Sequence, residues 1–371
     1  MTVRIITGDC RKMLNTLTSE SVNCCVTSPP YFGLRDYGTG AWDGGAEDCS
    51  HRPDDTPQAR GIDGSTLGGG KNHTGHKQEG FKSICGKCGA RRVDDQIGLE
   101  DTPEGFVLQL VSVMAEVRRV LRNDGTLWLN LGDSYSSGGR TTTTPQTLRG
   151  DTGAKETNVR PKNFAGIKPK DLLGIPWRVA LALQADGWYL RQDIIWHKPN
   201  PMPESVTDRC TKAHEYIFLL SKSPHYYYDA DAIAEPTVNK NMPGTNMTDT
   251  RETYGEQNGG NSGLRDFKKK YKEGEWPTDR NRRSVWTVPT QAFKGSHFAT
   301  FPPDLIEPCI LAGCPKGGTV LDPFGGAGTT GLVSDRLGRD AVLIELNPEY
   351  AAMADRRMKQ DGGMFYNLEA Q

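Results

Sequence analysis

The feature that most constrains the fold is a regular alternation of short apolar runs with segments of helical periodicity. In the last part of the chain, apolar runs at 319–321 and 341–345 alternate with helical patterns at 304–311, 328–336 and 348–358. Alternating strands and helices build sheets whose strands are mostly parallel and whose two faces are covered by helices. The sequence therefore predicts an α/β fold with helices on both faces of a mostly parallel sheet.

The first 220 residues contain the same kinds of element, separated by polar, glycine-rich insertions. The longest insertion covers 38–96. We expect Asn123-Asp124-Gly125 to end a helix, because these residues favour turns. The elements predicted here are strands at 3–7, 22–27, 126–131, 189–196 and 215–220, and helices at 10–17, 102–122 and 175–185.

A proline pair follows the second predicted strand, in the run Ser28, Pro29, Pro30 and Tyr31. This position is the carboxyl end of a strand, where open α/β sheets bind ligands. Prolines fix the backbone and remove N–H donors. Ser28 Oγ and the Pro29 carbonyl can accept the two hydrogens of an amino group on a planar ring, and Tyr31 can stack on that ring. For this motif alone, a turn that only ends a strand is the alternative.

A glycine-rich turn follows the strand at 319–321. Glycines let the backbone approach a ligand and adopt positive φ. The stretch 326–331 satisfies G-x-G-x-x-G, and Glu345 follows the next strand, so dinucleotide binding by a nicotinamide-dependent oxidoreductase is one interpretation. It leaves the proline pair unexplained. The turn comprises Asp322, Pro323, Phe324, Gly325, Gly326, Ala327, Gly328, Thr329 and Thr330.

Methyl transfer to an aromatic amino group would use both motifs. The nitrogen lone pair is delocalised into the ring, so this nitrogen is a poor nucleophile. Acceptors that hold the two amino hydrogens favour an sp³ nitrogen whose lone pair points at the methyl group. Positioning and charge stabilisation can carry such a step.

The two motifs together resemble those of the β group of DNA amino-methyltransferases, of the N4-cytosine/N6-adenine type. In this permuted class the catalytic motif, here 26–31, precedes the cofactor motif, here 322–330. The resemblance implies a Rossmann-like S-adenosylmethionine-dependent methyltransferase fold with circularly permuted motif order. It also implies S-adenosyl-L-methionine as cofactor and double-stranded DNA as substrate, with the target base flipped out of the duplex.

Shorter elements extend the resemblance. The segment 7–10 resembles the element whose acidic residue contacts the adenine of the cofactor. The segment 296–302 resembles the element that wraps the methionine end, and the carboxylate at 345 matches the one that binds the ribose. The further cofactor-binding residues implied are Asp9, Cys10, His297, Phe298, Ala299 and Glu345.

The resemblance places a target-recognition region at 236–290, with 1–235 and 291–371 as the catalytic domain. The net charge is −1, from 45 basic and 46 acidic residues, so DNA contact must rest on local clusters. A basic cluster can neutralise phosphates, although a solvated basic loop has the same composition. The expected DNA contacts are Lys198, Lys268, Lys269, Lys270, Lys272, Arg280, Arg282 and Arg283.

Ser28 bears on which base is methylated. Serine before Pro-Pro-Tyr is more typical of N4-cytosine enzymes and aspartate of N6-adenine enzymes, so the sequence favours cytosine, with adenine as the alternative. A protein-glutamine methyltransferase uses a similar motif, usually with asparagine first, and would not need the basic insertions. A DNA-binding module with a decayed catalytic site is a further alternative.

The insertion at 38–96 carries a zinc-knuckle pattern. Cys85 and Cys88 form a C-x-x-C turn that can present two thiolates to one ion. Cys49 and His51 supply a C-x-H pair, for which His73 or His76 could substitute. A structural Zn²⁺ would pin an insertion that has little apolar core. Thiols without metal are the alternative, and a redox role is disfavoured because no thioredoxin-like strand precedes the turn.

Cysteine usage indicates the compartment. The nine cysteines are an odd number, and several lie in apolar runs, as expected of reduced thiols in a cytosolic protein. No signal peptide and no apolar run of membrane-spanning length is visible. We expect a cytoplasmic protein, and some members of the resembling family form homodimers.

Overall fold

The computed structural model describes residues 1–33, 39–46, 48–49, 59–60, 79–80, 84–136, 167–237, 278–291, 301–362 and 367–370. The chain forms two compact units. One comprises Met1–Tyr227 with Ser284–Gln371, and the other comprises Tyr228–Arg283. Among the described helices, none combines the length and the apolar character that a bilayer crossing needs.

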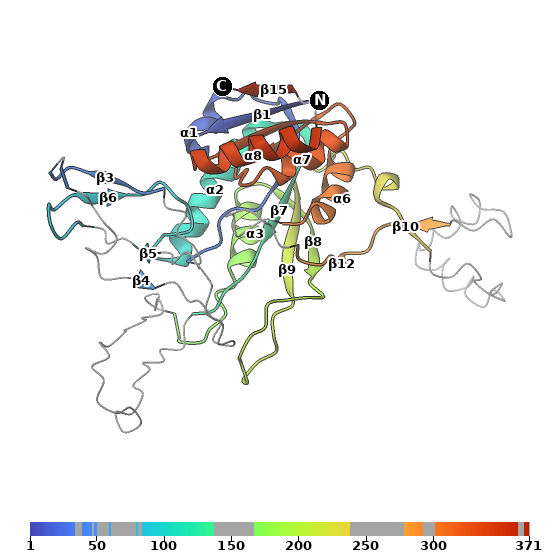
Figure 1. Cartoon of the computed structure of the whole chain (residues 1–371). Helices are drawn as coiled ribbons and strands as arrows, with labels where there is room; N and C mark the ends of the chain where they lie inside the picture. The colour runs from blue at the N-terminus through green and yellow to red at the C-terminus, as the bar shows by residue number, and fades with distance from the viewer. Residues whose placement is uncertain are drawn as a thin grey trace. The chain divides into compact units, whose positions relative to one another are not determined.

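The first unit is built on a mixed sheet whose described strands number nine, in the order β12-β8-β9-β7-β2-β13-β14-β1-β15. The two chain ends meet at one edge, where β1 pairs with β15 (Figure 1). The strands are β1 (Thr2–Thr7), β2 (Val22–Thr27), β7 (Leu121–Leu131), β8 (Tyr189–His197), β9 (His214–Ser221), β12 (Val285–Thr287), β13 (Thr319–Asp322), β14 (Asp340–Glu345) and β15 (Asn367–Ala370).

Strand direction brings distant parts of the sequence to one edge of the sheet. Strands β7, β2, β13, β14 and β1 are mutually parallel, so their carboxyl ends lie together. Strand β9 runs antiparallel to both β7 and β8, and β12 is parallel to β8. The carboxyl ends of β8 and β12 therefore reach the same edge, as does the amino end of β9.

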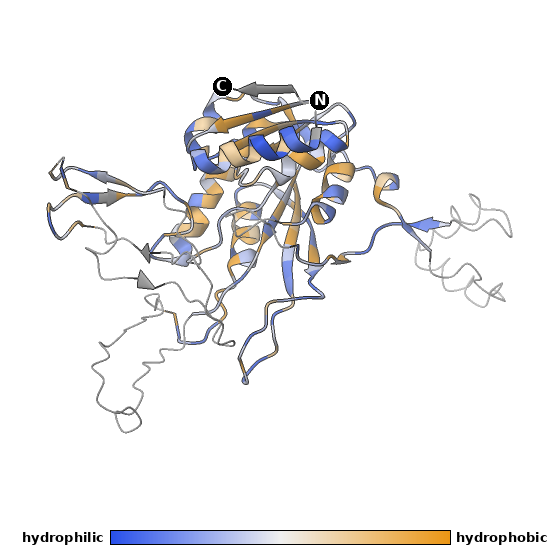
Figure 2. Cartoon of the chain, viewed as in Figure 1, coloured by the Kyte–Doolittle hydropathy of each residue, from blue (hydrophilic) through white to orange (hydrophobic). Residues whose placement is uncertain are grey.

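Helices cover both faces of this sheet (Figure 1). Neighbouring residues of β14 face opposite layers. Ile344 packs in the large core with α2 and α3, as does Cys25 of β2, whereas Leu343 packs with α8. Figure 2 shows the central strands largely in the hydrophobic colour, as expected for strands buried on both faces. The helices are α1 (Cys10–Met13), α2 (Pro103–Val120), α3 (Ile175–Ala185), α6 (Pro303–Gly313), α7 (Thr329–Arg336) and α8 (Pro348–Gly362).

The predicted α/β class with a mostly parallel sheet is confirmed, but two local expectations were wrong. The predicted helix at 10–17 is α1 followed by a 3-10 turn over Leu14–Thr16. Asn123-Asp124-Gly125 does not end a helix but lies within β7. Leu121 is already extended at ψ 140 and pairs with Val22, and the turn-forming residues create a register shift before Thr126 pairs with Cys24.

Strand β12 also differs from the expectation. Residues 284–290 were assigned to the target-recognition region, yet β12 adds a parallel strand beside β8 in the main sheet. Trp286 is 4% exposed and its ring lies 6.5 Å from that of Trp128. Burial of this aromatic pair holds the segment on the sheet.

Within the residues that the structure describes, three two-stranded ribbons accompany the sheet. In the first unit, β3 (Ala41–Asp43) pairs with β6 (Arg91–Val93), and β4 (Ala59–Arg60) pairs with β5 (Glu79–Gly80). In the second unit, β10 (Glu235–Pro236) pairs with β11 (Asp279–Arg280), next to a 3-10 turn over Asp231–Ile233. The β3–β6 ribbon lies within the predicted insertion and bears on the site described next.

Candidate active site

A cavity of about 320 Å³ opens at the carboxyl edge of the sheet. This volume lies in the range of about 300–1,000 Å³ found for small-molecule sites. Its walls come from the segments that follow the strands at this edge. Of the residues predicted as site residues, those that line it are Asp9, Cys10, Ser28, Pro29, Pro30, Tyr31, Lys198, Asp322, Pro323, Phe324, Gly325, Gly326, Thr329 and Glu345.

A buried carboxylate joins the two motifs. Thr27 Oγ1 donates to Asp322 Oδ1 at 2.6 Å, and Thr330 Oγ1 donates to Asp322 Oδ2 at 2.6 Å. Burial raises the pKa of Asp322, while these two hydroxyls and the Phe324 N–H oppose the rise. Thr27 and Asp322 are 295 positions apart, so this contact fixes the proline motif against the glycine turn.

The glycine turn is closed by its own hydrogen bonds. Gly326 N donates to Glu345 Oε2 at 2.7 Å, and Gly328 N donates to the Gly325 carbonyl at 2.8 Å. Gly328 has φ +76, and a Cβ there would lie 2.8 Å from that of Ala354, so only glycine fits. Gly328 and Thr330 support the turn from behind and do not line the cavity.

Glu345 stands at the carboxyl end of β14 with its carboxylate at the cavity. Its Oε1 accepts from Asn347 N at 2.9 Å and its Oε2 from Gly326 N. Burial raises the pKa of Glu345, and these two main-chain donors oppose the rise. A carboxylate oxygen has two acceptor positions, so each oxygen can accept one further hydrogen bond from a ligand hydroxyl.

Asp9 caps α1 beneath the same cavity. Its Oδ1 accepts from Arg11 N at 3.0 Å, and its Oδ2 pairs with Arg11 Nη2 at 2.9 Å. The neighbouring Cys10 thiol is buried and its pKa is raised to about 12, by desolvation first and Asp9 second. Cys10 is therefore a neutral thiol and has no thiolate character at neutral pH.

Ser28 lies at the cavity with its hydroxyl available. Within the part of the chain that the structure describes, Ser28 Oγ has no hydrogen-bond partner, whereas Thr27 next to it is fully buried and bonded to Asp322. Pro29 is buried and Pro30 is half-buried. The turn is therefore anchored at Thr27 and presents acceptors from Ser28 onward.

Tyr31 is held by three neighbours. Its hydroxyl donates to Glu215 Oε2 at 2.6 Å and lies 3.3 Å from Asn130 Oδ1. Its ring lies on the backbone of Gly132, where an added Cβ would come within 2.4 Å of the ring edge. These contacts fix the orientation of the ring at the cavity wall.

Lys198 forms an ion pair with Glu215 at the same wall. The two side chains are 17% and 15% exposed, and Lys198 Nζ lies 4.2 Å from the ring centroid of Trp196. Glu215 therefore receives hydrogen bonds from both Lys198 and Tyr31. A DNA contact of Lys198, as predicted from the sequence, would involve this half-buried pair.

Sequence reasoning missed Glu215, Asn130 and Gly132. Asn130 and Gly132 lie at the end of β7, which was predicted as a strand. Their contact with Tyr31 arises because β7 lies beside β2, and the sequence does not show this strand order. Glu215 begins an apolar run, so its only sequence signal is a charged residue at a strand terminus. It reaches the cavity because β9 is antiparallel, which the sequence does not show.

Several predicted residues cannot be placed at the site. His51, Lys268, Lys269, Lys270, Lys272, His297, Phe298 and Ala299 lie outside the described residues. From the segment 296–302, the buried Phe301 lines the cavity. In the second unit, Arg280 and Arg283 both pair with Glu235, at 2.9 and 2.7 Å, and Arg282 is half-buried.

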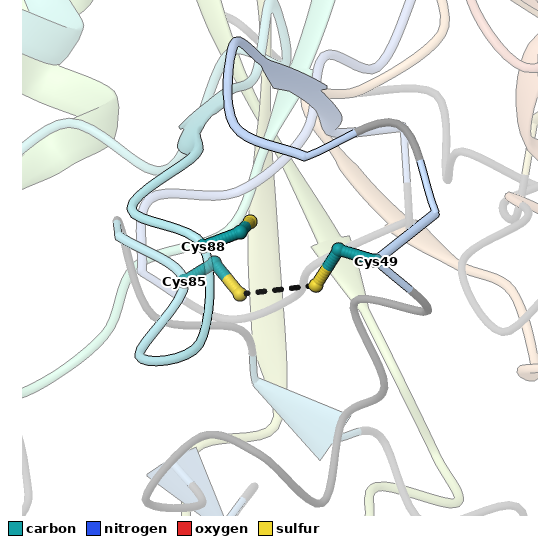
Figure 3. Close-up of side chains that lie close together, drawn as sticks. All are labelled: Cys49, Cys85 and Cys88. Atoms are coloured by element: carbon teal, nitrogen blue, oxygen red, sulfur yellow. Dashed lines mark hydrogen bonds between the residues drawn. The ribbon is translucent and has the colours of Figure 1, made fainter.

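Three cysteines gather beyond the Asp43–Arg91 pair, at the end of the β3–β6 ribbon away from Thr39 and Asp94 (Figure 3). The Sγ atoms of Cys49, Cys85 and Cys88 all lie within 4.8 Å of one another. Cys85 is buried, and the other two are half-buried. None of the three lines the cavity, so this cluster is separate from the reactive site.

Comparisons with known proteins agree with this geometry. The family model described as DNA methylase matches residues 22–356. The chain is 41% identical to the type II methyltransferase M.SmaI of Serratia marcescens, over 96% of this chain and 90% of that protein. It is 42% identical to the type II methyltransferase M.XycI of Xanthomonas campestris pv. cyanopsidis, over 95% of this chain and 86% of that protein.

A solved structure shows the same fold. TTHA0409 of Thermus thermophilus, complexed with S-adenosyl-L-methionine, superposes with a TM-score of 0.52 at 20% identity, covering 100% of this chain and 99% of that chain. The fold and cavity define a DNA amino-methyltransferase with permuted motif order. The chain belongs to the DNA methylase family, whose members are of the N6-adenine and N4-cytosine type.

Proposed function

We propose that this DNA methyltransferase transfers a methyl group from S-adenosyl-L-methionine to N4 of a cytosine flipped out of double-stranded DNA. The observation that carries the proposal is the Thr27–Asp322 hydrogen bond of 2.6 Å. It places the amino-binding motif and the glycine turn at one cavity, so an amino group held by the first lies next to a cofactor held by the second.

The cavity suits this cofactor better than a dinucleotide. A pyrophosphate at the glycine turn would need main-chain N–H donors, but those of Gly326 and Gly328 are already bonded to Glu345 and Gly325. The carboxylates of Asp9 and Glu345 at the cavity favour a ligand with hydroxyl and cationic groups. The cavity-lining residues that would hold the ligand are Asp9, Phe301, Pro323, Phe324, Gly325, Gly326, Thr329 and Glu345.

S-adenosyl-L-methionine supplies an electrophilic methyl group carried on a sulfonium. The chain supplies the orientation of the nucleophile. Ser28 Oγ and the Pro29 carbonyl accept the two amino hydrogens, which directs the nitrogen lone pair into the cavity. Tyr31, fixed by Glu215 and Gly132, offers its ring face to the base, and stacking with a base contributes about 1–3 kcal/mol.

Ser28 favours cytosine over adenine as the target. A hydroxyl accepts one amino hydrogen without carrying charge, and serine before Pro-Pro-Tyr is the form more typical of N4-cytosine enzymes. The names of the type II relatives indicate a restriction-modification system, which requires methylation of one specific DNA sequence.

Recognition of that DNA sequence is assigned to residues 236–290, most of which belong to the second unit. The basic residues predicted for 236–290 would contact phosphates or guanine edges. Arg280 and Arg283 share Glu235, and this pairing positions both guanidinium groups. Lys198 would contact DNA from the cavity wall and not from this region.

Nucleoside analysis tests the proposal. The full chain is incubated with S-adenosyl-L-methionine carrying a labelled methyl group and with plasmid DNA, and digested nucleosides are identified by mass spectrometry. We expect labelled N4-methylcytosine in the wild-type reaction and an initial rate about 10²-fold lower with Ser28→Ala. Labelled N6-methyladenine would overturn the cytosine assignment, and the absence of any labelled base would overturn the cofactor and substrate together.

A further inference from the structure

The three thiols beyond the Asp43–Arg91 pair of the β3–β6 ribbon lie close enough together to bind one metal ion (Figure 3). Cys85 and Cys88 come from one tight turn, and Cys49 approaches from the other arm of the insertion. We propose that Cys49, Cys85 and Cys88 bind a structural Zn²⁺ that closes the ribbon and thereby fixes one wall of the methyl-transfer cavity.

The spacing of the sulfurs fits a tetrahedral ion. A Zn–S bond of about 2.3 Å and a tetrahedral angle place two thiolate sulfurs about 3.8 Å apart. The Sγ atoms of Cys49 and Cys85 are 3.8 Å apart. A disulfide needs about 2.05 Å, and none of the nine cysteines, all of which lie in the described part of the chain, forms one.

The backbone around the thiols is arranged to hold them in place. Cys85 N donates to the Ala90 carbonyl at 2.8 Å, and Gly89 N donates to the Cys85 carbonyl at 3.0 Å. These bonds close the turn that carries Cys85 and Cys88. Gly45 then packs on this turn so tightly that a Cβ would lie 2.7 Å from Cys88 Sγ and 2.8 Å from the Ala90 Cβ.

Apolar burial contributes little to the order of the ribbon. Two of its large apolar side chains are exposed, Ile84 by 58% and Val93 by 46%, and Trp42 is half-buried; among its described apolar residues only Cys85 and Ala90 are buried, at 3% and 1%. An isolated two-stranded ribbon is marginal in water, and small elements without a core commonly depend on a metal or a disulfide. The free energy that orders this ribbon must therefore come largely from ligand bonds.

The ribbon leads directly into the cavity wall. Thr39 before β3 and Asp95, Gln96 and Ile97 after β6 line the cavity. Thr39 Oγ1 donates to Asp94 Oδ1 at 2.8 Å, and Arg11 Nη2 donates to the Asp95 carbonyl at 2.9 Å. Arg11 also pairs with Asp9, so an ordered ribbon would hold Arg11 and, through it, Asp9 at the cofactor end of the cavity. This consequence for the cavity rests on the proposed function, whereas metal binding does not.

The metal content of the purified full chain tests the inference. Protein prepared with added zinc sulfate and passed over a weak chelating resin is analysed for all first-row metals by mass spectrometry. We expect about one Zn²⁺ per chain, bound by thiolates in a structural site. Replacement by Co²⁺ should give thiolate-to-cobalt charge-transfer absorption and the intense visible bands of tetrahedral Co²⁺.

Matched variants identify the ligands. Cys85→Ser and Cys88→Ser should retain less than about a tenth of the metal, whereas Cys210→Ser, which removes an exposed thiol outside the cluster, should retain all of it. If the ligand variants fail to fold, substitutions at two glycines test the same inference. Gly45→Ala should lower zinc occupancy, whereas Gly89→Ala should keep it, because both have positive φ but a Cβ at Gly89 meets nothing within 4 Å.

Four results would overturn the inference: wild-type protein without zinc, iron in place of zinc, zinc retained by both ligand variants, or a Cys49–Cys85 disulfide in protein alkylated during denaturation. The outcome is independent of methyl transfer. Zinc bound by a chain that methylates no DNA would support the metal site and overturn the proposed function. DNA methylation by a chain that binds no zinc would support the proposed function and overturn the metal site.

Discussion

The reactive half of the cavity and the β3–β6 half are held by different forces. The reactive half rests on strands buried on both faces, with Asp322 fully bonded between Thr27 and Thr330. The ribbon half has two exposed strands, a few buried atoms and three thiols within 4.8 Å of one another. One pocket can thus have a wall fixed by the core beside a wall for which we propose that metal–ligand bonds supply the order.

This difference separates two kinds of mutational effect. Changes in the reactive half should alter the methyl-transfer step or the stability of the whole unit, because its residues belong to the core network. Changes in the ribbon half should alter order and metal content locally.

Loss of the Ser28 hydroxyl should have the largest effect on rate. Ser28→Ala removes one of the two acceptors for the amino hydrogens, and we expect kcat to fall by about 10²-fold, as for other single groups that stabilise a transition state. Ser21→Ala at the other end of β2 removes a hydroxyl that donates only to the Thr18 carbonyl and should leave kcat unchanged. Equal rates for the two variants would contradict the acceptor role.

Loss of the Thr27 hydroxyl should destabilise the fold. Thr27→Val removes one of the two donors to the buried Asp322 Oδ1, which keeps the Phe324 N–H at 3.0 Å, so we expect the free energy of unfolding to fall by about 1–3 kcal/mol. Thr16→Val is the control, because the Thr16 hydroxyl is exposed and donates to the Met13 carbonyl. Denaturant titration of both variants measures the difference, and no difference would show that the contact between the motifs is dispensable.

Neutralising Glu215 should weaken binding of the target base at Tyr31. Glu215→Gln keeps an acceptor for Tyr31 but removes the charge that pairs with Lys198, and we expect kcat/KM for DNA to fall about 10-fold, since hydrogen bonds to charged groups contribute about 1.5–3 kcal/mol. Cofactor affinity should stay constant. Glu204→Gln is the control, because Glu204 pairs with Arg209 and does not line the cavity. A change in cofactor affinity alone would contradict the assignment.

Cofactor affinity should depend on pH through Glu345. Burial raises its pKa above the ordinary value of a glutamate, so protonation removes an acceptor at a higher pH than for an exposed carboxylate. We therefore expect calorimetric affinity to decline as pH falls through this raised pKa. Glu345→Gln should bind more weakly and lose this pH dependence, and a wild-type profile in the variant would exclude Glu345 as the titrating group.

Much of the reactive half could be predicted from the sequence, because its chemistry is local. Ser28 to Tyr31 and Asp322 to Glu345 are short motifs at strand ends, and parallel strands bring such ends together. Glu215 could not be predicted, because it reaches the cavity only through the antiparallel direction of β9. The failure at Asn123-Asp124-Gly125 has a similar cause, since pairing of β7 with β2 overrides the turn preference of these residues.

The ribbon half was predictable only in part. The C-x-x-C spacing indicated Cys85 and Cys88, because two thiols on one turn are a local pattern. The C-x-H pattern also indicated Cys49, but more weakly, because the approach of Cys49 across 36 positions depends on pairing of β3 with β6, which exposed side chains do not specify. Gly45 gave no signal of its own, since its need for glycine arises from contact with Cys88 and Ala90.

The two halves of the cavity should be stabilised independently, one by the core and one by the proposed Zn²⁺. Hydrogen exchange of the full chain with and without zinc tests this most directly. On metal removal we predict loss of protection in β3, β6 and residues 94–97, with β2 and β13 unchanged. Unchanged exchange in the ribbon, or equal loss of protection in both halves, would contradict the account.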